Sequence, residues 1–266
     1  MYKVPVIALL LSLVMSVACT SVQKLKDGTL AYERKQYAVA IELLDKEYKK
    51  AKTRLERGRL AFLLAESYDK TNQSDAALDW YQKAYDNQYG IDALKAYAYT
   101  LKKAERYEDA MEAFKELGIE IGSPYEFKKD ITACEIALGW QEISRVEYRT
   151  EVADFNSGYS EYSPALWKED QLVFTSDRQT SQGSDTYYWT GNKFSDLYVA
   201  DLNSGAVSAF DAPFNTENNE GSLCFNNDFT EAYFVRCFGE KKEDNYCKIM
   251  YSALKNNTWS EPRVLE

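Results

Sequence analysis

The sequence predicts an α + β multidomain protein in which an N-terminal α-helical solenoid precedes antiparallel sheets built as successive blades. The stretch Phe155–Arg178 recurs in altered form at Phe214–Cys237, at an offset of 59 that becomes 60 after the turn between its two strands. Upstream, Ala40, Ala77 and Ala110 stand 37 and 33 residues apart within one helical pattern. Repetition at a fixed period is typical of arrays whose units bury their faces against one another.

Composition limits the classes of function. The chain has 266 residues, enough for two domains, and its hydrophobic content of 45% suffices for packed cores. The net charge is −10 and the acidic excess lies after residue 150, so nucleic acid is not an expected partner. The absence of histidine excludes Ser-His-Asp and Cys-His catalysis and the usual histidine zinc sites. We therefore predict a protein that is not an enzyme and uses no cofactor or metal.

Residues 1–18 have the pattern of a secretory signal peptide, with an early lysine, an apolar stretch and small residues before Cys19. As a helix, the apolar stretch would span about 21 Å, which is less than the roughly 30 Å of a bilayer core. A transmembrane or buried helix is the alternative. The tetrapeptide Ser16–Cys19 resembles a bacterial lipobox. The resemblance implies acylation of Cys19, a linker at 19–25, and attachment to the outer membrane on its periplasmic face.

Four further cysteines are Cys134, Cys224, Cys237 and Cys247. Cys224 and Cys237 fall on successive predicted strands and are a candidate disulfide in a compartment that permits one. Cys247 is an alternative partner, and unpaired thiols are the remaining alternative. The spacings match no CxxC metal or redox pair.

Residues 26–141 are predicted to form helical repeats. Three segments, beginning at Tyr37, Ser74 and Tyr107, place an alanine three positions on and a large apolar residue four positions after that. Small residues let paired helices approach closely. The pattern resembles the tetratricopeptide repeat, which implies a concave groove that binds a peptide; a spacer docked on neighbouring domains is the alternative. Pro124 to Trp140 is predicted to be one further helix that caps the array.

Residues 142–266 are predicted to form two four-stranded blades of a β-propeller, because each copy of the repeat contains two short apolar strands joined by a turn. Ile143–Ala153 is expected to add an edge strand. The expected blade strands are 160–167, 171–176, 196–202 and 206–210, then 221–225, 231–236, 248–254 and 258–265. Because a propeller needs about four to eight blades to close, we expect a fragment of a longer protein; an exposed sheet edge is the alternative.

Ser163-Pro164, Leu172–Arg178 and Asp196–Val199 resemble the WD-type propeller repeat of TolB. The order of lipobox, helical repeats and blades is similar to that of outer-membrane lipoproteins that continue into an OmpA-like peptidoglycan-binding domain. Some of these serve type IX secretion and gliding. The resemblance implies cell-envelope proteins as partners, with peptidoglycan bound only through a C-terminal domain absent from these 266 residues.

Two kinds of polar residue stand out in the blades. Glu161 and Glu220 occupy equivalent positions of the repeat, which predicts a structural role and not a catalytic carboxylate pair. Asp177 and Arg178 are predicted to form a hydrogen-bonded pair that fixes a turn, with a charged site at the propeller mouth as the alternative.

An insertion in the first blade carries Asp185, Tyr187, Tyr188 and Trp189. Aromatic rings beside a carboxylate are suited to stacking on sugars or anchoring a partner; the alternative is a loop folded onto the neighbouring blade. The leading hypothesis is a lipid-anchored periplasmic scaffold. The second hypothesis is an envelope module that binds glycan or peptide through these aromatic residues.

Overall fold

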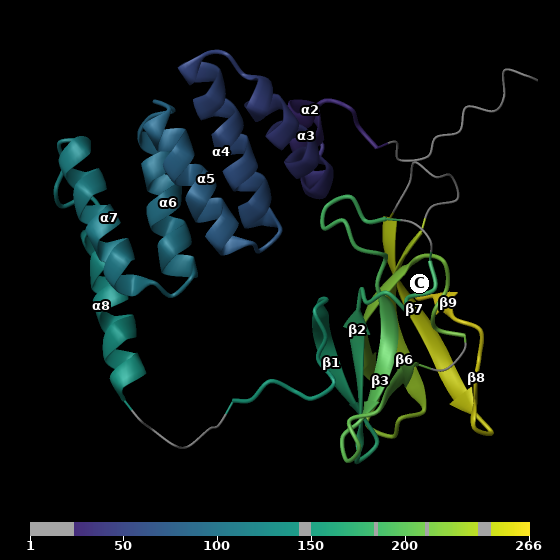
Figure 1. The fold of residues 1–266 in the computed structure, drawn as a ribbon. Coiled ribbons are helices and arrows are strands. Elements are labelled where there is room, and N and C mark those ends of the chain that lie inside the picture. Colours follow the sequence, from purple (N-terminus) through teal and green to yellow (C-terminus); the bar gives the residue numbers. More distant parts are fainter. Residues whose placement is uncertain (1–23, 144–149, 184–185, 211–212, 239–245) are drawn as a thin grey trace, which may run out of the picture. The chain divides into compact units, whose positions relative to one another are not determined.

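The computed structural model describes residues 24–143, 150–183, 186–210, 213–238 and 246–266 (Figure 1). Within these ranges the fold is mixed α + β, with seven helices followed by two antiparallel sheets. The chain divides into two compact units. The helical unit comprises Lys24–Asn156 and Asp185–Lys193, and the sheet unit comprises Ser157–Ser184 and Phe194–Glu266.

The helical unit is a row of helices in which each packs against its neighbours in sequence (Figure 1). The helices are α2 (Gly28–Glu33), α3 (Tyr37–Lys50), α4 (Arg54–Lys70), α5 (Ser74–Asp86), α6 (Ile91–Lys103), α7 (Tyr107–Glu120) and α8 (Lys128–Glu142).

The same backbone motif ends α2, α4 and α6. Lys35, Asn72 and Glu105 follow these helices in the left-handed conformation, with φ of 59°, 58° and 60°. In each case the next residue donates its N–H to the carbonyl five positions earlier, at 2.9–3.0 Å. This is the Schellman motif, which satisfies carbonyls that a helix end would leave unpaired. The three helix ends therefore recur at the spacing of the repeated alanines.

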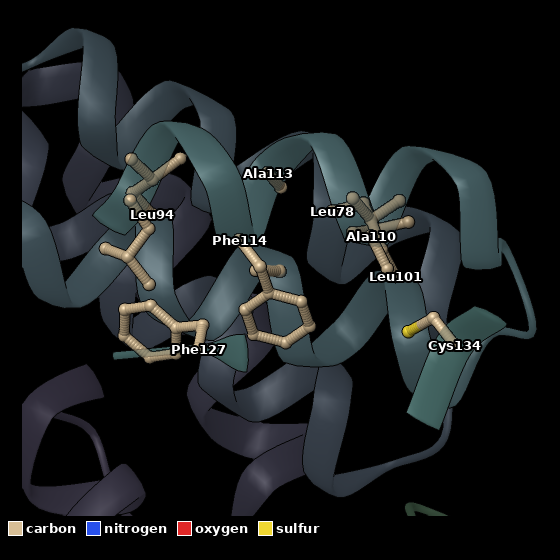
Figure 2. Close-up of a cluster of buried hydrophobic side chains, with 10 residues drawn as sticks. Leu78, Leu94, Leu101, Ala110, Ala113, Phe114, Phe127 and Cys134 are labelled. Carbon is tan, nitrogen blue, oxygen red and sulfur yellow. The ribbon is translucent and has the colours of Figure 1, made fainter. Parts of the chain in front are cut away.

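Small side chains allow the close packing of these helices. Ala40, Ala77 and Ala110 are fully buried, as the repeat predicts. The core at the C-terminal end of the row is built around the stacked rings of Phe114 and Phe127, whose centroids are 5.6 Å apart (Figure 2).

The last helix differs from the prediction. α8 begins at Lys128, not at Pro124, because the residues before it form a turn in which Ser123 and Tyr125 accept backbone hydrogen bonds. Two large apolar side chains of α8 are exposed among polar ones: Ile136 is 48% exposed and Trp140 is 70% exposed.

The sheet unit contains a four-stranded sheet in the order β1-β2-β3-β4 and a five-stranded sheet in the order β5-β6-β7-β8, with β9 also paired to β7. The strands are β1 (Glu161–Trp167), β2 (Gln171–Ser176), β3 (Asp196–Asp201), β4 (Val207–Ala209), β5 (Asn219–Phe225), β6 (Glu231–Phe238), β7 (Tyr246–Lys255), β8 (Thr258–Trp259) and β9 (Arg263–Val264).

The expected strand 258–265 is wrong, because the chain is interrupted between β8 and β9, where Pro262 has no N–H to donate. The expected edge strand at 143–153 is not seen at 150–153, and residues 144–149 lie outside the described part of the chain.

The two copies of the sequence repeat fold as equivalent strand pairs. In β1 the register shifts between Tyr162 and Ala165, and in β5 it shifts between Gly221 and Cys224. Each irregularity contains a serine with positive φ, Ser163 at 51° and Ser222 at 55°. Both copies of the repeat therefore have a β-bulge at the same position, where one strand has an extra residue relative to its partner. The offset of 59 residues between the copies is the same before and after the bulge.

The sheets share one core. Trp167 from β1 packs against Trp259, with ring centroids 5.6 Å apart, and against Phe225 from β5 at 4.5 Å. Phe214, which precedes β5, is fully buried between Phe210 and Phe234. The facing sides of the two sheets are therefore joined by a core in which aromatic and aliphatic residues are mixed.

Candidate functional site

A cleft of about 180 Å³ lies among three consecutive helices of the helical unit. α4 supplies acidic side chains, α5 supplies one tyrosine, and α6 supplies the opposite wall. Its lining residues are Glu66, Asp69, Tyr81, Ala96, Tyr99, Thr100 and Lys103. Because helical periodicity places residues three and four apart on one face, Ala96, Tyr99, Thr100 and Lys103 all reach the same side of α6.

Glu66 is the centre of the acidic wall. Tyr81 donates its hydroxyl to this carboxylate at 2.6 Å, and Tyr32 donates to it at 3.4 Å. Burial, followed by the hydrogen bond to Glu66, raises the pKa of Tyr81. Burial and the charge of Glu66 raise the pKa of Tyr32 to about 12. Both phenols therefore stay protonated at physiological pH and act as donors.

Two lysines of α6 pair with carboxylates of α4 and α8. Lys103 lies 3.0 Å from Asp69, and Lys102 lies 2.8 Å from Asp130. Asp130 also accepts a hydrogen bond from Tyr99 at 3.2 Å. The hydrogen bond between Lys102 and Asp130 raises the pKa of Lys102. The lysine is therefore held in its charged form. These partly exposed pairs can exchange partners at low cost, since such pairs contribute little to stability.

The cleft offers carboxylates, phenols and an ammonium group along the helix row, which suits hydrogen bonding to an extended polar segment. The tetratricopeptide pattern predicted a groove but did not single out Glu66, Asp69 or Tyr99. A signal was present in the helical spacing. Glu66 and Asp69 are three residues apart in α4, and Tyr99 and Lys103 are four apart in α6, so each pair lies on one helix face.

The aromatic insertion packs within the helical unit. The Trp189 ring meets Tyr37 edge-on at 4.9 Å, and its indole N–H donates to the carbonyl of Lys70 at 3.1 Å. Tyr188 joins the buried cluster around α3 and α4. Tyr187 remains 41% exposed. Asp185 and Cys19 lie outside the residues that the structure describes.

The candidate disulfide is wrong. Cys237 bonds to Cys247, the alternative partner, because these residues face each other directly in the β6–β7 register. Cys224 pairs in register with Tyr233 and is a free, exposed thiol, and Cys134 is a free, buried one.

Each repeated glutamate forms an ion pair. Glu220 lies 2.7 Å from Arg236, and Glu161 lies 3.0 Å from Arg178. Burial raises the pKa of Glu220 despite its hydrogen bonds from Thr216 and the nearby arginine. Burial also favours the neutral form of Glu161, but hydrogen bonds from Ser157 and the arginine outweigh it and lower the pKa.

The structure shows several partners of Asp177 and Arg178. Asp177 accepts the backbone N–H of Ser160 at 2.8 Å, which holds the chain entering β1. The Arg178 guanidinium extends over the rings of Phe174 and Tyr198 in addition to its bond with the glutamate.

No family model matches this chain, and a search of curated proteins returned no match. Among the described residues, no group of three or more Cys, Asp or Glu side chains is placed to hold a metal ion. In the same part of the chain, every helix is too short or too polar to cross a membrane.

Proposed function

We propose that this chain is a lipid-anchored periplasmic scaffold of an outer-membrane assembly and works by binding, without catalysis. Its helical unit would be a tetratricopeptide array and its sheet unit two blades of a TolB-like propeller. The partners would be other cell-envelope proteins, as in type IX secretion or cell-wall tethering. The observation that carries the proposal is the polar cleft on α4, α5 and α6, which is formed by successive units of a repeated array.

Anchoring is tested at Cys19. The Cys19→Ala variant is expected to leave the membrane fraction and to lose incorporation of labelled fatty acid, because the stable attachment comes from acyl chains on that thiol. The matched control is Cys224→Ala, which removes an exposed thiol of the sheet unit. Retention of Cys19→Ala in salt-washed membranes would contradict the anchor.

Partner binding is tested in the cleft. A photo-crosslinking residue in place of Tyr99 is expected to trap an envelope protein in cells, and Lys103→Glu should reduce the adduct about tenfold by placing a third acid beside Asp69. Lys115→Glu is the matched control, because it makes the same charge change at an exposed position of α7. Equal adduct yields in the two charge variants would reject the cleft as the contact site.

A further inference from the structure

The turn between α3 and α4 is strongly basic. Residues 49–57 contain five Lys or Arg and one Asp or Glu, whereas the whole chain carries −10. Leu55, at the second position of α4, is 74% exposed among these charges. We call Leu55 and the five basic residues the basic turn. The five basic side chains, all of them exposed, are Lys49, Lys50, Lys52, Arg54 and Arg57.

Most of this charge has no counter-ion within the described residues. Lys49 pairs with a carboxylate one helical turn earlier, at 2.5 Å, and the other four basic side chains form no ion pair in that part of the chain. Arg54 donates to the backbone carbonyl of Asp86 at 3.1 Å. Arg57 donates to that of Ala51, also at 3.1 Å. These bonds hold the guanidinium groups at the turn and leave their charge available to an anionic partner.

The equivalent turns of the helix row do not have this charge. We compared the stretch from the last two residues of one helix to the first four of the next. At the α5–α6 turn this stretch is 85–94, with no basic and two acidic residues. At the α7–α8 turn it is 119–131, with two basic and three acidic residues. The packing of helix pairs therefore does not require a basic turn, and the charge belongs to the pair nearest the N-terminus.

The chain before α2 runs along α3 towards the basic turn. Lys24 pairs with Glu42 of α3 at 3.0 Å, and the N–H of Gly28 donates to Glu47 of the same helix at 2.9 Å. Glu42 lies only about 12 Å along the helix from the end of α3. Cys19 precedes Lys24 by five residues, so the two are at most about 18 Å apart. Acyl chains on Cys19 would therefore keep α3 and the basic turn close to the lipid surface.

We propose that the basic turn binds an anionic lipid surface beside the acyl anchor. This inference rests on the anchor of the proposed function, because the short tether from Cys19 makes lipid the surface within reach. Ammonium and guanidinium groups are attracted to the phosphates of anionic headgroups. The exposed Leu55 enters the boundary between headgroups and acyl chains. The acyl chains attach the protein, and the basic turn orients it, with the α3–α4 turn of the helical unit facing the lipid.

The test uses the full chain with Cys19→Ala, so that acyl chains do not cause binding. At low salt this protein is expected to float with vesicles of phosphatidylcholine and phosphatidylglycerol, and not with vesicles of phosphatidylcholine alone. Added salt should release it, because ions screen exposed charges. Lys50→Glu/Lys52→Glu should lower vesicle binding at least about tenfold, since each exposed lysine adds to the attraction. Leu55→Ser should lower it about fivefold, because less apolar surface enters the lipid.

The control is Lys128→Glu/Lys129→Glu, which makes the same charge change at two exposed lysines at the start of α8. It should bind vesicles as the parent does, and circular dichroism should show all variants folded. Equal binding to vesicles of phosphatidylcholine alone would overturn the proposal, as would equal losses in the two double variants. So would no binding to anionic vesicles at low salt, the result expected if the basic turn contacts an acidic protein.

The lipid anchor and the basic turn can fail separately in these experiments. Fatty-acid incorporation and retention in salt-washed membranes depend on Cys19. Vesicle binding by the Cys19→Ala protein depends on the basic turn and is removed by salt. A protein that is acylated but does not bind anionic vesicles without its acyl chains would keep the anchor and overturn the role of the basic turn.

Discussion

The Arg236→Ala variant is expected to lose about 3–5 kcal/mol of unfolding free energy in the sheet unit, because it leaves a buried carboxylate unpaired. The Glu220 side chain is 0% exposed, and Arg236 also donates to the carbonyl of Phe214 at 2.8 Å. The arginine therefore connects β6 to the chain that enters β5. Denaturant titration followed by tryptophan fluorescence measures the loss.

The loss of unfolding free energy in Arg236→Ala should depend on pH. Burial already raises the pKa of Glu220, and removal of Arg236 should raise it further. A carboxyl with a raised folded-state pKa keeps its proton where the unfolded chain has lost it, so stability falls as the pH rises through that window. We expect Arg236→Ala to be closer to the parent protein in stability at acidic pH than at pH 8.

The repeat supplies a control for this variant. Arg178→Ala removes the equivalent partner of Glu161, whose ion pair is more exposed and whose pKa is lowered. Arg178→Ala should lose less unfolding free energy than Arg236→Ala, about 1–2 kcal/mol. The stabilisation that Glu161 provides should be lost as the pH falls through its lowered pKa. Equal losses in the two arginine variants, or a loss in Arg236→Ala that grows on acidification, would contradict this account.

Phe214→Ala is expected to destabilise the sheet unit by about 3–5 kcal/mol, since it removes a fully buried ring and leaves a cavity. The ring lies within 4.9–5.3 Å of Phe210, Phe234 and Trp259, measured between centroids. Near-ultraviolet circular dichroism and chemical denaturation should report the loss of this packing.

Phe155→Ala is the matched control for this core substitution. Phe155 is the equivalent residue of the first repeat, and it is only half-buried. We expect Phe155→Ala to lower the unfolding free energy by about 1 kcal/mol. A similar cost at both positions would show that Phe214 does not have a special place between the sheets.

Local sequence signals predicted much of the fold. The alanine pattern led to α3, α5 and α7, and the 59-residue repeat led to the pairs β1–β2 and β5–β6. Those predictions depend on side-chain periodicity, which is a property of a single segment. The strand expected at 258–265 failed because Pro262 interrupts it, and its two parts, β8 and β9, pair separately with β7.

The cysteines and the aromatic insertion show a second limit. Spacing allowed Cys237 to pair with Cys224 or Cys247, and the β6–β7 register decides for Cys247. The sequence allowed Trp189 to be an accessible stacking residue or part of a loop folded onto the neighbouring blade. In the structure its indole N–H donates to Lys70, a residue 119 positions away. Contacts between distant segments carry no periodic signal, so they could not be found in advance.

The amino-acid sequence alone determined that the chain is built from repeats, with helices first and strands second. The spacing of apolar and small residues within each segment is enough to indicate this. The sequence also ruled out histidine-dependent chemistry. Only the tertiary structure decided which polar side chains meet in the cleft and which cysteines bond. These outcomes depend on strand register and helix packing, where residues far apart in the chain come within contact distance.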